Sequence, residues 1–435
     1  MTTSVAPGRR SFGSLLLAYS IAFPLFGRAA FPIVREKSGI TLLSSFTDPQ
    51  MVSTYLLGLI LFVRLVSSEQ VLRWSNFRTI SFLAFFVLVA LCSAVNSRIP
   101  MFSVWRCFEV TLTVLWTAAM VQDASASYDS ARAIRTFYAI SVAILVAVIV
   151  GLVLNPTGAW LIEGDVARLT GTTGYMTNSN EVGVIAAVIS VGAYVRAVEF
   201  RRLHFVMASL FFAVICYFSH SRGSYIAFTC GFICANVMLA RIVERRVAIW
   251  VSILFPVLIV CVLLAVSSDL RDFFVFLMTR GHEVSNLEGF GGRLQLWEFG
   301  LSIFKLHPLL GTGYGTYPDG LEGGHFHNIF MELLVTTGIV GVLCYMAFLF
   351  NAGSMIRKVF SKISVRQAAQ RTLTADILTI PVIILVANMA SAGSAYFSWD
   401  LLGLVSVVAA VSSLANSSTA IHSVANAVRP PNIMF

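Results

Sequence analysis

The sequence predicts an all-α polytopic membrane protein, with about twelve transmembrane helices in a single membrane-embedded domain over residues 1–435. Hydrophobic residues make up 57% of the chain and charged residues only 12%, against roughly 25% charged in soluble domains. Apolar runs of about 17 to 22 residues recur from end to end, and each is long enough to cross a ~30 Å hydrocarbon core as a helix. The composition therefore excludes an ordinary soluble enzyme.

The predicted spans follow one another closely along the chain. They cover approximately residues 13–34, 51–68, 78–95, 103–121, 134–154, 179–197, 204–219, 222–242, 247–266, 327–352, 373–392 and 399–416. The first of them is interrupted by Pro24 and Gly27. All seven cysteines fall inside these runs, so we expect buried thiols and no disulfide framework.

The basic residues indicate the orientation. More than half of the 30 Lys and Arg residues lie at the termini or in alternate connections between the spans, the last of which is 353–372. The positive-inside rule then places both termini and these connections in the cytoplasm. The net charge of +9 is thereby explained by membrane topology, and we expect no nucleic-acid partner.

Two connections on the outer side are long, residues 155–178 and 267–326. Within the second, Leu294, Trp297, Leu301 and Phe304 share one face at helical spacing. A short helix of this composition is typical of the membrane interface. We therefore expect an interfacial helix inside a large outer loop region.

Three arginines break the charge rule, because Arg168, Arg222 and Arg293 fall at or near the outer surface. A charge at a membrane boundary is a candidate functional group, and a guanidinium binds phosphate oxygens with two parallel hydrogen bonds. A lipid headgroup or a diphosphate is the expected ligand. The alternatives are a salt bridge to Asp165 or Asp400 for Arg222, and pairing with lipid phosphate for Arg293.

Two histidines stand where the tenth span begins. His327 and Asn328 directly precede the apolar run, and His325 lies two residues before His327. Histidine titrates closest to neutral pH and is the usual residue for moving a proton. We expect His327 to be a general base and His325 and Asn328 to contact substrate; the alternative is that His327 packs or caps the helix.

The run from Arg168 to Gly183 is rich in hydroxyl and amide side chains and precedes a span. These groups, with Asn180 among them, could line a sugar-binding cleft. They could equally form a solvated loop that ends in a helix cap at Asn180.

The sequence predicts no metal ion and no cofactor. Asp319, Glu322, His325 and His327 are close enough in sequence to bind a divalent cation, but they match no spaced metal motif.

In this order, the motifs resemble those of the O-antigen ligase and polymerase superfamily of bacterial envelopes. They are Arg168-Leu-Thr-Gly with Asn180, Ser221-Arg222-Gly223, Gly292-Arg293-Leu294, and Pro308 with Gly311-x-Gly313. The most specific motif is His327-Asn328 followed by Gly338 and Gly341.

The resemblance implies a membrane-embedded glycosyltransferase of the C type. Such ligases transfer O-antigen polysaccharide from undecaprenyl diphosphate to a sugar of lipid A–core, without a metal, at the periplasmic face of the bacterial inner membrane. Residues 267–326 would then form the periplasmic loop region. By this resemblance Arg222 and Arg293, with Arg168, hold the diphosphate, and His327 activates the acceptor hydroxyl.

Other functions stay open from the sequence. An O-antigen polymerase or a protein O-oligosaccharyltransferase would share the architecture. A transporter of lipid-linked or anionic solutes would explain the boundary arginines but not His327, and a receptor or scaffold in the envelope is a further possibility.

Overall fold

The computed structural model shows a mostly helical protein. It describes residues 49–66, 78–127, 129, 131–163, 166–171, 178–243, 293–316, 326–360, 368–391 and 398–427. The predicted spans 13–34 and 247–266 lie outside these ranges, as does most of the loop region 267–326.

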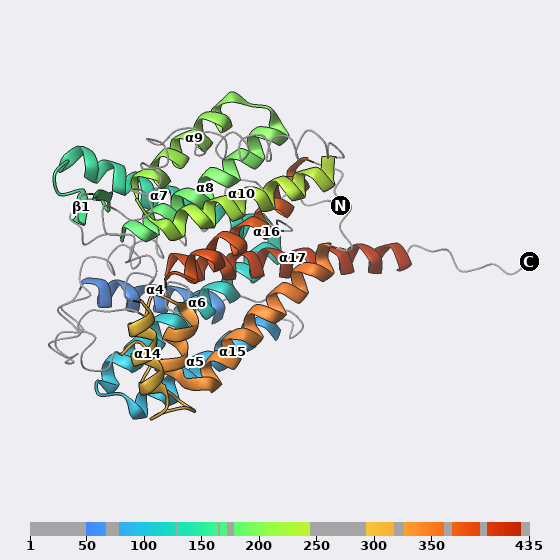
Figure 1. Ribbon diagram of the computed structural model, residues 1–435. Helices are drawn as coiled ribbons and strands as arrows, with labels where there is room; N and C mark the ends of the chain where they lie inside the picture. The colour runs from blue at the N-terminus through green and yellow to red at the C-terminus, as the bar shows by residue number, and fades with distance from the viewer. Residues whose placement is uncertain are drawn as a thin grey trace, which may run out of the picture.

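The described elements are numbered as in Figure 1. They are α4 (Pro49–Val66), α5 (Arg78–Ser93), η2 (Ala94–Asn96), α6 (Pro100–Ser127), α7 (Arg132–Leu154), β1 (Trp160–Glu163), β2 (Val166–Leu169), α8 (Ser179–Phe200), α9 (Leu203–Phe218), α10 (Arg222–Val243), α14 (Arg293–Phe304), α15 (Ile329–Phe360), α16 (Ala368–Asn388) and α17 (Trp399–Ala427).

The chain is a polytopic membrane protein. Within the described ranges, 7 helices are long and apolar enough to cross a membrane, and three shorter apolar helices accompany them. Each predicted span that falls in these ranges coincides with one of α4 to α10 or α15 to α17. The total of about twelve spans stays a prediction.

Helix α8 lies at the centre of one half of the bundle, where it contacts α7, α9, α10 and α16. Its small residues permit this crowding: Gly183 and Gly192 both lie so close to neighbouring side chains that a Cβ would overlap them. The other half contains α4, α5, α6, α14 and α15 (Figure 1). Helix α17 joins the halves through contacts with α6, α7, α15 and α16.

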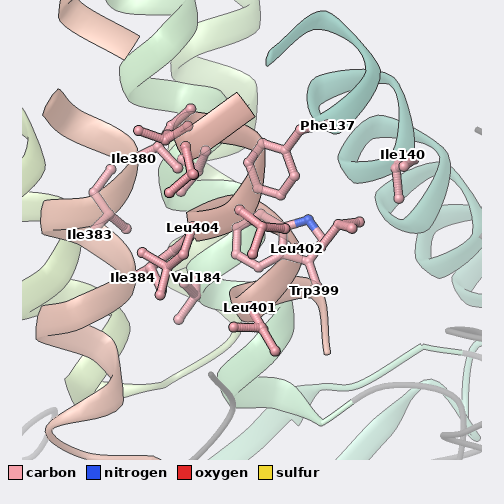
Figure 2. Close-up of a cluster of buried hydrophobic side chains, with 14 of the residues drawn as sticks. Phe137, Ile140, Val184, Ile380, Ile383, Ile384, Trp399, Leu401, Leu402 and Leu404 are labelled. Atoms are coloured by element: carbon pink, nitrogen blue, oxygen red, sulfur yellow. The ribbon is translucent and has the colours of Figure 1, made fainter. Parts of the chain in front are cut away.

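The apolar core extends through both halves of the bundle, and Figure 2 shows the part where α7, α8, α16 and α17 meet. The rings of Phe137 and Trp399 lie 4.8 Å apart between their centroids. The indole nitrogen of Trp399 donates to Ser141 Oγ at 2.7 Å, so the one polar group of this ring is satisfied inside the core.

One end of the bundle carries buried ion pairs. Arg196 of α8 donates to both carboxylate oxygens of Asp376 of α16, at 2.8 and 3.2 Å, and Tyr138 OH donates to the same carboxylate at 2.8 Å. Arg371 and Glu199 form a second pair between the same two helices at 2.8 Å. Because each charge is paired, these contacts hold α8 and α16 in register at little net cost.

The other end of the bundle carries a small hairpin, and we call it the hairpin end. Strands β1 and β2 pair antiparallel, with Leu161 opposite Arg168. The hairpin and α14 lie at the left of Figure 1, whereas α17 ends at the right. The sequence identifies residues 155–178 only as a long connection, and the hairpin within it is an addition from the structure.

Candidate functional site at the hairpin end

Arg168 lies on β2 and is turned into the protein, with only 6% of its surface exposed. Its Nη2 donates to Asn180 Oδ1 at 2.7 Å, and its Nε donates to the carbonyl oxygen of Ser219 at 3.4 Å. The guanidinium therefore joins the hairpin to the first turn of α8 and to the end of α9.

Asn180 is not the helix cap. The N-cap of α8 is Asn178, whose side chain accepts from the backbone nitrogen of Asn180 at 3.0 Å. This leaves the Asn180 side chain available to Arg168. The predicted alternative of a helix cap at Asn180 is wrong, because the cap lies two residues earlier. Either asparagine could cap a helix, and only the backbone conformation selects between them.

Arg222 is the first residue of α10, directly after a tight turn. The Ser221 hydroxyl accepts from the Ser224 backbone nitrogen at 3.3 Å, and Ser224 Oγ donates to the Asn180 carbonyl at 3.1 Å. A Cβ on Gly223 would lie 3.2 Å from the Ala390 methyl group. Arg222 is thus placed between the start of α8 and the end of α16.

Arg293 is the first residue of α14, and this helix is docked on the start of α15. Trp297 Nε1 donates to the carbonyl oxygen of Phe326 at 2.8 Å. Burial, followed by the nearby charge of Arg222, lowers the pKa of Arg293 from its usual value. The two guanidinium groups are therefore close enough to repel each other, an arrangement that a bound anion would stabilise.

The predicted apolar face of α14 is divided between contact with the protein and the exposed surface. Trp297 faces inward with Leu296, Gly300 and Ile303, whereas Leu294 and Leu301 are 42% and 43% exposed. Helical spacing located the helix correctly, but two apolar stripes run along it and only docking on α15 decides which is buried.

His327 occupies a constrained backbone position. It is half-buried and adopts a left-handed conformation with φ of 51°, which is uncommon outside glycine and persists where neighbouring contacts enforce it. On one side, the Phe326 backbone nitrogen donates to Glu332 Oε2 at 3.2 Å. On the other side stands the cap of α15.

Asn328 is the N-cap of α15. Its Oδ1 accepts from the backbone nitrogens of Phe330 and Met331, at 2.9 and 3.2 Å, and its Nδ2 donates to the Met389 carbonyl at 3.2 Å. The structure thus shows a capping role that also ties α15 to α16. A substrate contact by Asn328 stays a prediction.

These contacts bring three of the predicted residues to one place. Met389 and Ala390, at the end of α16, touch Asn328 and Gly223 respectively. Through them the segments carrying His327 and Arg222 become neighbours, and Arg293 joins by its proximity to Arg222. Arg168 and Asn180 connect to this group less directly, because Arg168 contacts Ser219 and Asn180 contacts Ser224, which lie close to Arg222 in the chain. His325 lies outside the described residues, as do Asp319 and Glu322.

A buried acid lies in the same region. Asp400, at the start of α17, is 6% exposed, accepts a hydrogen bond from Asn388, and lies within electrostatic range of Glu181 of α8. The sequence marked Asp400 only as a possible partner of Arg222, and no spacing signal connects it with Asn388 or Glu181.

Helix α15 is broken behind His327. Gly338 has φ of 66° and ψ of −171°, which is not helical. The sequence predicts one continuous span over 327–352, and the break corrects this prediction. The break separates a half-helix, residues 329–337, from the longer segment 339–360.

Residues 308–313, which we call the bridging segment, fill the break. The nitrogens of Thr312 and Gly313 donate to the carbonyls of Val335 and Thr336, at 2.9 and 3.1 Å. Beyond the break, the nitrogens of Ile339 and Val340 donate to the carbonyls of Pro308 and Leu309, at 2.9 and 3.4 Å. Backbone groups that the break removes from the helix are thus paired again, as a buried backbone requires.

This arrangement explains the glycines of the two motifs. A Cβ on Gly338 would overlap the Leu309 carbonyl, and a Cβ on Gly311 would overlap the backbone of Thr336 and Thr337. Both glycines also have positive φ, 66° and 71°. In this structure the motif glycines therefore shape the backbone that holds His327.

We expect Gly338→Ala to destabilise the protein. The conformation of Gly338 is nearly restricted to glycine, so strain alone should cost about 1–3 kcal/mol, and the methyl group would displace the bridging segment. Thermal unfolding in detergent measures the effect. Gly353→Ala is the matched control, since no atom beyond the neighbouring backbone of its own helix lies within 4 Å of that Cβ and alanine favours a helix. Equal melting temperatures for both variants would contradict the role of Gly338.

Part of the chain is similar to known proteins. A family profile described as O-antigen ligase matches residues 206–346. Over 68 residues the chain is 35% identical to the exopolysaccharide production protein ExoQ of Rhizobium meliloti (strain 1021), an alignment covering 12% of this chain and 16% of that protein. The profile match includes Arg222, Arg293 and His327 and supports a membrane glycan-processing function. The resemblance to the O-antigen ligase family that the motifs predicted is thus confirmed for residues 206–346.

Proposed function

We propose that this protein is a metal-independent glycosyltransferase. It transfers O-antigen polysaccharide from undecaprenyl diphosphate to a sugar of lipid A–core at the periplasmic face of the inner membrane. The observation that carries the proposal is the convergence of Arg222, Arg293 and His327 at the hairpin end, with the mutual proximity of the two arginines.

The chemistry needs two kinds of assistance. Arg222 and Arg293 bind the diphosphate and stabilise the charge it gains when its bond to the anomeric carbon breaks. His327 accepts the proton of the acceptor hydroxyl as the new bond from that oxygen to the anomeric carbon forms. Attack from the side opposite the leaving diphosphate inverts the anomeric centre. Arg168, Asn180, Asn328 and His325 are proposed to contact the substrates.

A second candidate is an O-antigen polymerase, in which the acceptor is another lipid-linked glycan. The similarity to a protein named for exopolysaccharide production favours it. Donor chemistry and site residues would be the same, and only the acceptor would differ.

One assay tests both. Purified protein is incubated with an undecaprenyl diphosphate-linked oligosaccharide, with and without lipid A–core, in excess EDTA. A lipid A–core product heavier by one oligosaccharide supports the ligase. Longer lipid-linked chains without lipid A–core support the polymerase. Absence of both products would refute the transferase, and activity that returns only with Mg²⁺ would refute metal independence.

The proposed orientation makes a separate prediction. Alkaline phosphatase fused after Leu310 should be active, because the 267–326 region faces the periplasm, and fusion after Val365 should be inactive, because basic residues hold the 353–372 connection in the cytoplasm. Expression of both fusions must be matched by immunoblot. The opposite pattern would place the site on the wrong side for this reaction.

A further inference from the structure

The turn between α5 and α6 binds the bridging segment and the residues that directly follow it, as far as Thr316. Asn96 Nδ2 donates to the Gly311 carbonyl at 3.0 Å. The Ser93 hydroxyl accepts from the Tyr314 backbone nitrogen at 2.9 Å, and Ser97 Oγ donates to Thr316 Oγ1 at 3.2 Å. Three side chains of one short turn, residues 93–97, thus hold residues that lie more than 200 positions away.

The fit between the two segments is close. Gly313 has φ of 110°, and a Cβ there would overlap Ser97. Tyr314 is fully buried, with its ring edge-on to Phe86 at 5.8 Å between centroids. The segment therefore has little freedom to shift along the 93–97 turn.

The same segment determines where the half-helix 329–337 ends. Thr312 and Gly313 bind the carbonyls of its last turn, those of Val335 and Thr336. A half-helix of nine residues is a rigid rod about 14 Å long, with Asn328 and His327 at its far end. A shift of the bridging segment is therefore transmitted to His327.

We propose that Asn96, assisted by Ser93 and Ser97, is a positioning residue for His327. The 93–97 turn fixes the bridging segment, the bridging segment fixes the half-helix, and the half-helix carries the base. The inference rests on the proposed function, because it concerns the base of the transfer reaction. All three residues lie outside the 206–346 region that matches the family profile.

Asn96→Asp tests the proposal. The carboxylate has the shape of the amide but cannot donate to the Gly311 carbonyl and repels it. We expect kcat to fall by about 10-fold to 10²-fold, as small displacements of catalytic groups do, with the KM for the donor unchanged. Asn155→Asp is the control: it adds the same charge at an exposed position of the hairpin end, where Oδ1 accepts from the Gly158 nitrogen and a carboxylate can do so too.

A crosslink provides a rescue. In Ser97→Cys/Thr316→Cys, a disulfide would replace the hydrogen bond between the two hydroxyls. Oxidation should restore transfer in the Asn96→Asp background, and reduction should abolish the gain. Ser93→Ala is the variant to use if Asn96→Asp does not fold. It removes the acceptor for the Tyr314 nitrogen and the bond that the Ser93 hydroxyl donates to the Ala90 carbonyl within α5, adds no charge, and should lower kcat less.

Hydrogen exchange of the backbone amides of Ile339 and Val340 measures how firmly the bridging segment is held at the break, and this measurement needs no substrate. Faster exchange in Asn96→Asp supports the coupling, and unchanged exchange overturns it. Wild-type rates of transfer in Asn96→Asp, or loss of activity when the otherwise native protein is crosslinked, also overturn the proposal. A native protein that transfers nothing refutes the proposed function instead, while the exchange result still decides whether the turn holds the break.

Discussion

Replacing His327 with alanine should lower the rate of transfer by about 10²-fold to 10⁴-fold, the usual cost of losing a general base, and leave donor binding largely intact. The reason is geometric: His327 lies next to the cap of α15, while the donor diphosphate is assigned to Arg222 and Arg293 on other helices. Single-turnover transfer and equilibrium binding of the lipid-linked donor, measured on the same preparation, separate the two effects. The native rate should also fall in acid as the imidazole becomes protonated.

The left-handed backbone of His327 requires a second variant. Alanine is strained at φ of 51°, whereas asparagine tolerates this region and cannot act as a base. Loss of transfer in both variants, with folding preserved in His327→Asn, would assign the defect to chemistry. His307→Ala, an exposed histidine nearby in the chain, should be neutral. Near-native transfer by His327→Asn would move the base elsewhere, with His325 as the first candidate.

Arg222→Lys and Arg293→Lys should each impair transfer by about 10-fold to 10²-fold, because a lysine keeps the charge but loses one of two parallel hydrogen bonds of about 1.5–3 kcal/mol. Expression and melting temperature should stay native, since the substitution keeps the charge and most of the side-chain volume. Initial rates over a range of donor concentrations provide the measurement. Arg202→Lys, exposed at the opposite end of the bundle, is the control.

Two results would overturn this assignment. Full activity in both lysine variants would remove the argument from paired hydrogen bonds. Loss of folded protein would show that the arginines are structural. Burial, and after it the charge of Arg222, lowers the pKa of Arg293. We therefore expect Arg222→Gln to weaken donor binding and, by removing the repulsion between the two charges, to stabilise the unliganded protein relative to the native one.

The membrane helices could be predicted from the sequence because a lipid-facing helix must be apolar over a defined length. The candidate site residues could be proposed from the sequence because arginines on the outer side of the membrane depart from the usual distribution of basic residues; their roles stay predictions. The β1–β2 hairpin could not, since two strands of 4 residues leave no periodic pattern. The break at Gly338 was also missed, because residues 329–360 remain apolar across it and the bridging segment comes from elsewhere in the chain. The sequence around Ser93 and Asn96 does not indicate a positioning role, because that role depends on their contacts with Tyr314 and Gly311, which only the folded structure shows.

The break in α15 also indicates how deep in the membrane the candidate site lies. Arg357 and Lys358 stand in the last turn of this helix, and the residues from Ile339 to Ile356 include no charged side chain. Counting back from Arg357 at 1.5 Å per residue, a hydrocarbon layer of ~30 Å ends close to Gly338.

In the proposed orientation, the half-helix that carries His327 therefore stands in the headgroup layer, above the acyl chains. A carrier lipid would keep its hydrocarbon tail in the bilayer, while its phosphates arrive at the level where headgroup phosphates already reside. The hydrophilic acceptor sugar would reach His327 without entering the hydrocarbon core of the bilayer. The position of the kink would thus set the depth of the reaction: the donor diphosphate and the core sugar, each attached to a membrane lipid, would meet at the level of the headgroups.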